Sequence, residues 1–190
     1  ELFISRIHAW QEFMQRDKAK LGKEAEIGLY GEIHCLKKIL DSGVPARNAV
    51  EGWVGPERGI QDFNFGSFAL EVKTTTASEG FPAKIMSLEQ LDDSSVNPLF
   101  LFGCRLETDT RGHSLRELIE VVRDFLRSDR SARVAFERKL LFSGYLLKDE
   151  EEYNTSFNVS EENCYLVDEY FPRLTPYTVH SNIVKARYEI

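Results

Sequence analysis

The sequence has few cysteines and no long apolar run. Its 3 cysteines are an odd number without a C-x-x-C pair, and its 4 histidines lack metal-ligand spacing. A disulfide framework and a zinc ribbon are therefore excluded, and a reducing cytoplasm is the expected compartment. The longest apolar run covers residues 98–102, far short of the roughly 20 residues that span a bilayer, so no membrane contact is expected. No secretory leader opens the chain, which starts at Glu1 rather than Met, and we expect an N-terminal segment to be missing.

Length and composition are those of an ordinary globular protein. The chain has 190 residues, of which 42% are hydrophobic and 29% are charged, and this composition argues against disorder. A chain of this length buries about 70% of the surface that its unfolded state exposes. We therefore expect one domain over residues 1–190.

The acidic charge is concentrated late in the chain. The net charge is −7, yet residues 1–140 carry 20 basic and 22 acidic side chains, whereas residues 141–190 carry 4 and 9. Most of the excess lies at 148–152 and 161–162, which predicts a solvated loop. The late arginines at 116–138 alternate with acids, a pattern that favours a solvated face over a DNA-binding face. The acidic balance weakens a nucleic-acid function without excluding it.

The spacing of apolar residues predicts a mixed α/β fold with a mixed central sheet flanked by helices on both sides. A capping box, Ser114-x-x-Glu117, marks one helix start. Gly28 and Gly31 lower the helix propensity of their segment, so something is expected to pack closely against that face. Helices are expected over 2–16, 24–40, 114–128 and 131–142, one helical turn at 88–91, and strands over 49–54, 60–65, 68–74, 83–86, 99–106, 164–171 and 181–189.

One hairpin gathers the charged residues of interest. A two-residue turn at 66–67 places residues whose numbers sum to 133 opposite each other. Asp62 then lies across from Glu71, with Lys73 two residues on, and paired Cβ atoms in such a ladder are about 5 Å apart. Facing like charges destabilise a sheet, whereas paired carboxylates suit a hard cation such as Mg²⁺. A lysine beside them can orient or deprotonate water, although an exposed face on which Lys73 merely neutralises Glu71 is the alternative.

The same residues carry a family resemblance. Asp62 followed by Glu71-Val72-Lys73 resembles the PD-(D/E)XK signature of restriction-endonuclease-like nucleases. Glu32, at the end of the run GLYGE, stands where that family has a helical Glu in chain order. Gln61 occupies the position of the signature's Pro, a departure that leaves the acidic residue intact. Residues 70–75, 87–91 and 170–174 are similar to a bacterial branch of the superfamily.

The resemblance implies a role for each matching residue. Asp62 and Glu71 would be metal-binding carboxylates, with the Val72 carbonyl as a third oxygen and Glu32 as a further carboxylate near or on a metal. Lys73 would position the attacking water. Gln90 would contact the water or a backbone phosphate. A solvent-facing helix position for Glu32 and a purely structural place for Gln90 remain the alternatives.

The function that this resemblance implies is DNA endonuclease activity with Mg²⁺ or Mn²⁺, in bacterial restriction or defence. DNA is the expected partner, and a homodimer is left open. One rival is a catalytically silent nuclease fold that serves as a scaffold or nucleic-acid-binding module in a larger assembly. A metal-dependent hydrolase of small phosphoesters is the third interpretation.

Overall fold

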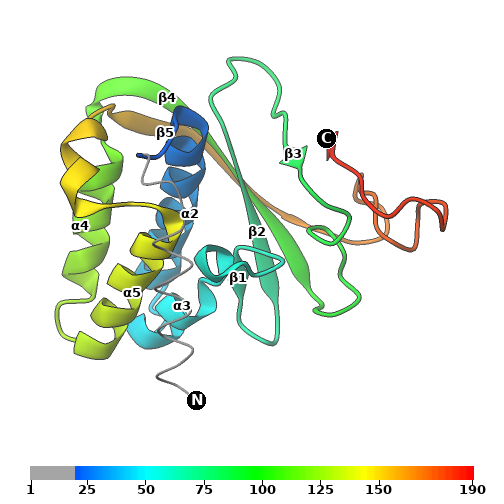
Figure 1. Ribbon diagram of the computed structural model, residues 1–190, viewed down its shortest axis with the longest axis horizontal. Coiled ribbons are helices and arrows are strands. Elements are labelled where there is room, and N and C mark those ends of the chain that lie inside the picture. Colours follow the sequence, from blue (N-terminus) through cyan, green and yellow to red (C-terminus); the bar gives the residue numbers. More distant parts are fainter. Residues whose placement is uncertain (1–19) are drawn as a thin grey trace.

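A four-stranded mixed sheet organises the part of the chain that the computed structural model describes, residues 20–190 (Figure 1). Strand β2 pairs antiparallel with β1 and parallel with β4, and β4 pairs antiparallel with β5. The predicted mixed sheet flanked by helices is confirmed. The helix expected over 2–16 lies outside the described residues. In sheet order the strands are β1 (Phe63–Asn64), β2 (Ala69–Thr75), β4 (Leu99–His113) and β5 (Phe157–Leu166).

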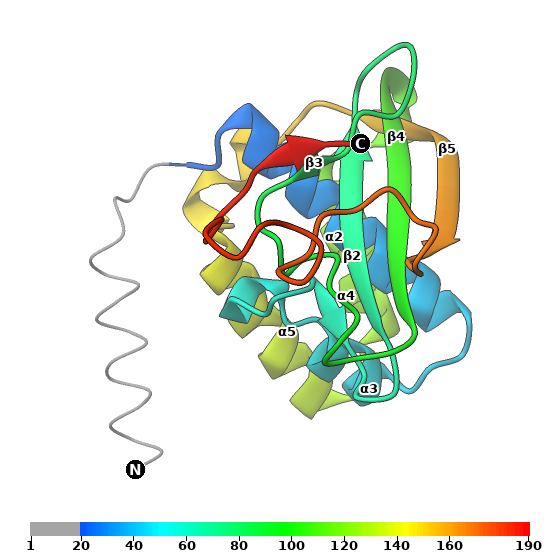
Figure 2. The same cartoon turned by 90° about the vertical axis from the view of Figure 1, so that its right-hand side faces the viewer.

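The α-helices cover one face of this sheet (Figures 1 and 2). Helix α4 begins with the predicted capping box, in which Ser114 Oγ accepts from the Glu117 backbone N–H. Even-numbered β2 residues such as Leu70 and Val72 pack into the core beneath the helices. The helices are α2 (Lys23–Asp41), α3 (Ala46–Gly52), α4 (Leu115–Phe125) and α5 (Arg130–Ser143).

Helices were expected on both sides of the sheet, but a smaller sheet and the C-terminal segment cover the opposite face (Figure 2). Strand β3 (Lys84–Ile85) pairs antiparallel with β6 (Tyr188–Glu189). A second buried cluster, which includes Ala69, Ile85 and Leu99, lies between this small sheet and β2–β4. Because side chains alternate along β2, this strand contributes residues to two hydrophobic cores, one on each face of the sheet.

The predicted hairpin has the predicted register but shorter strands. Phe63 pairs with Leu70 and Asn64 with Ala69, so the numbers of each pair sum to 133. Strand β1 ends after these two pairs, so residues 71–75 of β2 have no partner strand on that side. The free edge of β2 next to Glu71 is therefore open.

Several predicted elements were wrong. Residues 49–54 were expected to form a strand, but helix α3 ends at Gly52 and a short 3₁₀ helix, Gly55–Glu57, follows. Residues 88–91 form turns and bends rather than a helical turn. The acidic stretch at 148–152 belongs to a 3₁₀ helix, Leu147–Glu152, and residues 161–162 belong to strand β5.

The acidic residues of β5 are paired rather than freely solvated. Glu161 lies 3.0 Å from Arg105 Nη2. Glu162 contacts His34 Nε2 at 2.9 Å and Lys38 Nζ at 2.5 Å. The late strands also differ from expectation, because β5 ends at Leu166 and β6 contains only Tyr188–Glu189. No helix within residues 20–190 is long and apolar enough to cross a membrane.

Candidate active site

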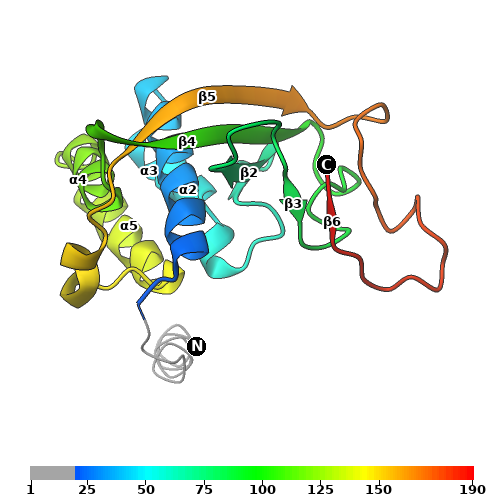
Figure 3. The same ribbon diagram turned by 90° about the horizontal axis from the view of Figure 1, so that it is seen from above.

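A cavity of about 670 Å³ lies at the open edge of β2. Residues of helix α2 line one wall and residues of the β3–β6 sheet line another. The view from above shows these elements on the two sides of β2 (Figure 3). All six residues predicted for the site line this cavity: Glu32, Asp62, Glu71, Val72, Lys73 and Gln90. The structure thus brings together side chains from a helix, a strand and two connecting segments.

Glu71 is the most deeply buried of these residues, with 1% of its surface exposed. Its Oε1 lies 2.7 Å from Lys73 Nζ. Its Oε2 is buried and has no hydrogen-bond partner among the described residues. Burial raises the pKa of the Glu71 carboxyl to about 8, with a further contribution from the charge of Asp62 and only partial relief from Lys73. Lys73 and the Asp62 backbone N–H both lower the pKa of this carboxyl, yet the Oε2 atom itself makes no hydrogen bond with a described residue.

Asp62 is held at the edge of β2 rather than directly across from Glu71 in the ladder. It lies one residue before β1, and its carbonyl accepts from the backbone N–H groups of Val54 and Gly55. Its side-chain Oδ2 accepts from the Val72 backbone N–H at 2.8 Å. The predicted cross-strand carboxylate pair is corrected in this respect, because Asp62 uses its side chain to bond the unpaired edge of β2. Burial raises its pKa, and the bond from Val72 opposes that rise.

Glu32 reaches the cavity from helix α2. Its Oε2 accepts from Trp53 Nε1 at 2.7 Å. Burial raises the pKa of Glu32 well above its usual value, and the nearby charge of Asp62 adds to this effect. A Cβ at Gly55 would lie 2.8 Å from Asp62 Oδ1 and 3.2 Å from Glu32 Oε2, so the missing side chain at Gly55 lets both carboxylates sit against the backbone.

Two glutamines connect the far side of the cavity to Lys73. Gln90 Oε1 accepts from the Met86 backbone N–H at 2.7 Å and from Lys73 Nζ at 3.5 Å. Gln61, buried at 3% exposure, donates from Nε2 to the carbonyls of Glu89 at 3.2 Å and Gln90 at 3.4 Å. The residue that replaces the signature Pro therefore positions the backbone that carries Gln90. The departure from the signature at Gln61 is visible in the sequence, but nothing in the sequence indicates this role.

A buried lysine fixes the segment that carries Trp53. Lys139 of α5 is 2% exposed and donates to the carbonyls of Glu51 and Trp53. Its Nζ also lies 3.1 Å from Glu57 Oε2. Burial lowers its pKa. Neither Trp53 nor Lys139 was predicted to support the site, because both act through contacts between residues far apart in the chain.

The donor set fits a magnesium-type site of modest protein coordination. Within residues 20–190, no three His, Cys, Asp or Glu side chains group closely enough to enclose a metal. Mg²⁺ is commonly held by one or two carboxylates, with water and substrate phosphates as its other ligands. Asp62, Glu71 and the Val72 carbonyl supply such oxygens at one cavity, and the unpartnered Glu71 Oε2 provides an acceptor that a cation would satisfy.

Comparison with known proteins gives one match. A family model described as "Putative PD-(D/E)XK family member, (DUF4420)" matches residues 1–190. No curated protein matches the chain, and no solved structure matches it. The match covers the whole length of the sequence, including the segment that carries the cavity residues.

Proposed function

Because the chain belongs to the PD-(D/E)XK family, we propose that its carboxylate-lined cavity is a nuclease centre that hydrolyses phosphodiester bonds in DNA with Mg²⁺ or Mn²⁺. The observation that carries this proposal is Glu71 Oε2, a buried carboxylate oxygen without a partner in a cavity that Lys73 also lines. An unsatisfied buried carboxylate is costly. Such an unpaired oxygen is expected where a bound ligand, here a metal ion, satisfies it.

Asp62, Glu71 and the Val72 carbonyl would hold the metal, and Glu32 would add a carboxylate at its margin. When bound, the metal would polarise the scissile phosphate and lower the pKa of a water molecule. The bond from Val72 N–H fixes one oxygen of Asp62 and leaves Oδ1 facing Gly55. The donor oxygens would therefore be in place before substrate arrives.

Lys73 is placed to orient the attacking water. Its ammonium lies between Glu71 Oε1 at 2.7 Å and Gln90 Oε1 at 3.5 Å. These two acceptors direct two of its three N–H groups. The third remains to donate to a water or to a phosphate oxygen that becomes more negative during attack. Gln90 would thus act mainly through Lys73.

We also propose that residues 1–190 act as one nuclease domain, and that the activity serves bacterial restriction or defence. The first rests on a family match that spans the chain, and the second rests on the resemblance alone. A catalytically silent scaffold is the rival, and the net charge of −7 favours it, since phosphate binding needs basic surface.

The deciding experiment is cleavage of supercoiled plasmid and of labelled DNA in the presence of Mg²⁺ or Mn²⁺. Wild type is expected to cleave, and Glu71→Ala and Lys73→Ala are expected to abolish cleavage while circular dichroism stays unchanged. Lys37→Ala is the matched control, because among residues 20–190 Lys37 pairs only with Asp41, on the surface of helix α2. Cleavage by purified Glu71→Ala would place the activity elsewhere, and inactive wild type with every ion would favour the scaffold.

A further inference from the structure

The C-terminal loop, residues 174–188, is closed by a single side chain. The Tyr188 hydroxyl accepts from the Leu174 backbone N–H at 2.9 Å and donates to the Leu174 carbonyl at 3.1 Å. The two ends of the segment therefore meet, as in compact surface loops that often carry function. Most of the residues between them are exposed and belong to no helix or strand.

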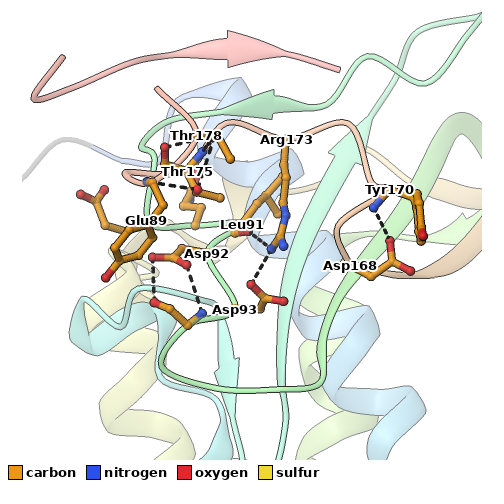
Figure 4. A network of polar contacts seen from close by, with 12 residues as sticks. Glu89, Leu91, Asp92, Asp93, Asp168, Tyr170, Arg173, Thr175 and Thr178 are labelled. Carbon is orange, nitrogen blue, oxygen red and sulfur yellow. Dashed lines mark hydrogen bonds and ion pairs between the residues drawn. The ribbon is translucent and has the colours of Figure 1, made fainter. Parts of the chain in front are cut away.

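The base of this loop is attached to the segment that carries Gln90. Just before the loop, Arg173 Nη1 donates to the Leu91 carbonyl at 2.7 Å and lies 2.9 Å from Asp93 Oδ1 (Figure 4). Thr175 and Thr178 form a local hydrogen-bonded turn next to it (Figure 4). Leu91 follows Gln90 directly, so the segment that holds the base of the loop also carries a residue that lines the cavity.

The loop also ends on a wall of the cavity. Strand β6 follows it and pairs with β3, where Lys84 is opposite Glu189. Both of these residues line the cavity. Figures 2 and 3 show the C-terminal segment beside β3 and on the side of the sheet away from the helices. A substrate strand that enters the cavity at this wall would meet the loop.

The charge of this segment is opposite to that of the chain as a whole. From Arg173 to Tyr188 there are three basic residues and no acidic one, although the chain carries −7. Lys185 and Arg187 are exposed and form no ion pair with any residue that the structure describes. On the helices, Arg123 and Arg127 are paired with acids, whereas Arg130 and Arg133 are exposed and, within residues 20–190, unpaired. What distinguishes Lys185 and Arg187 is that they lie in the segment that leads directly into strand β6, whose Glu189 lines the cavity.

The same loop carries an exposed aromatic ring. Tyr177 is 80% exposed, and no described residue covers its ring. Aromatic side chains exposed next to basic residues are the arrangement on which unpaired bases stack, at about 1–3 kcal/mol per base. Lysine and arginine supply the accompanying contacts to phosphates.

We propose that the C-terminal loop is a nucleic-acid-binding surface that holds an unpaired stretch of the substrate strand beside the cavity. Lys185 and Arg187 bind backbone phosphates, and Tyr177 stacks on a base. This inference takes the class of substrate from the proposed function and adds where the strand binds. The charge of the loop favours a polyanion over an apolar protein partner.

The test measures binding without cleavage. A fluorescein-labelled 20-nucleotide single strand and its blunt duplex are titrated with protein in EDTA at several salt concentrations. Lys185→Ala/Arg187→Ala is expected to weaken binding at least about tenfold at low salt. It should also reduce the salt slope for the single strand by about 1.4, which corresponds to two phosphate contacts. Tyr177→Ala is expected to weaken single-strand binding roughly 5- to 150-fold, with a smaller effect on the duplex.

Arg130→Ala/Arg133→Ala is the matched control, because both arginines are exposed on helix α5, form no ion pair within residues 20–190 and do not line the cavity. It removes the same charge and is expected to bind like wild type. A loss in this control, or unchanged binding and salt slope in the loop variants, would overturn the proposal. Unchanged binding in the loop variants would favour a protein, rather than a nucleic acid, as the partner of this loop. Loss of binding in the loop variants would support the proposal even if wild type cleaves nothing, so the two proposals can fail separately.

Discussion

Trp53 Nε1 donates a hydrogen bond to Glu32 Oε2 at 2.7 Å, and this bond connects two otherwise separate parts of the site. Trp53 is fully buried, and its own carbonyl accepts from Lys139. The helix that carries Glu32 and the connection that leads to Asp62 are thereby held in one arrangement. A carboxylate whose pKa is raised by burial is positioned by a donor that partly offsets that burial.

Trp53→Phe is expected to remove this bond while it keeps an aromatic ring. A hydrogen bond to a charged group contributes about 1.5–3 kcal/mol. In a double-mutant cycle with Glu32→Ala, which removes the acceptor, urea unfolding should therefore show a coupling energy of at least about 1 kcal/mol between the two residues. Phe136→Leu is the control. The ring centroid of Phe136 lies 5.9 Å from that of Trp53, and Phe136 makes no hydrogen bond to Glu32. Equal coupling for Phe136 and Trp53 would show that packing, rather than the bond, links Trp53 to Glu32.

The course of the chain before Trp53 shows where sequence reasoning failed. Val50 and Trp53 are typical strand residues, and Pro45 follows the helix expected over 24–40, where a proline commonly stops a helix. Pro45 instead precedes the first residue of α3, and the buried residues Ala49, Val50 and Trp53 have helical spacing. A proline that ends one helix can equally begin the next. The boundary signal was present, but the short apolar run did not distinguish a strand from a helix of about two turns.

Gly28 and Gly31 are predicted to respond in opposite ways to alanine. A Cβ at Gly31 would collide with Thr74 Oγ1, whereas a Cβ at Gly28 would meet nothing within 4 Å. The expected close packing is therefore present at Gly31 and absent at Gly28, which lines the cavity. Gly28→Ala should stabilise the fold by up to about 1 kcal/mol through helix propensity. Gly31→Ala should destabilise it, as thermal unfolding of the two variants would show, and a rise in melting temperature for both would contradict this assignment.

The residues that line the cavity could be predicted from the sequence, whereas the residues that hold them in position could not. The residues of the motif are close in sequence, and the turn at 66–67 fixes the hairpin register, so Glu71 and Lys73 could be placed from spacing. Lys139 and Gln61 act on backbone carbonyls of distant segments, and no periodicity reports such contacts. In the sequence, Gln61 is only a departure from the signature's Pro. In the structure, its side chain positions the backbone that carries Gln90.

Glu71 is predicted to make metal-free stability fall as pH rises. Its folded pKa is about 8 against an ordinary value of 4.5, so between these values the native state holds a proton that the unfolded chain has released. The stabilising effect is complete below about pH 4.5 and is lost as pH rises through about 8, with a slope of at most about 1.4 kcal/mol per pH unit. Urea unfolding in EDTA from pH 5 to 9 should show a shallower fall for Glu71→Gln than for wild type. Glu51→Gln, a change at an exposed carboxylate paired with Arg47, should keep the slope of wild type. A wild-type slope in Glu71→Gln would mean that another group titrates.

Metal should stabilise wild type through the same carboxylates whose proximity costs stability in its absence. Burial and the charge of Asp62 both raise the pKa of Glu71, so at neutral pH the metal-free pair opposes folding. Mg²⁺ or Mn²⁺ at tenfold above its dissociation constant should add about 1.4 kcal/mol.

Asp62→Asn/Glu71→Gln should melt higher than metal-free wild type and should not respond to the ion. The amides keep oxygens that can accept from Val72 N–H and Lys73, so the neighbouring bonds are preserved. Glu150→Gln/Glu151→Gln removes the same charge from the Leu147–Glu152 3₁₀ helix and should respond to metal as wild type does. Thermal unfolding of the three proteins with and without metal shows whether the ion binds in this cavity or elsewhere on the protein. An equal metal response in Asp62→Asn/Glu71→Gln and wild type would place the bound ions outside this cavity, because neither substituted side chain retains the negative charge that a divalent cation requires.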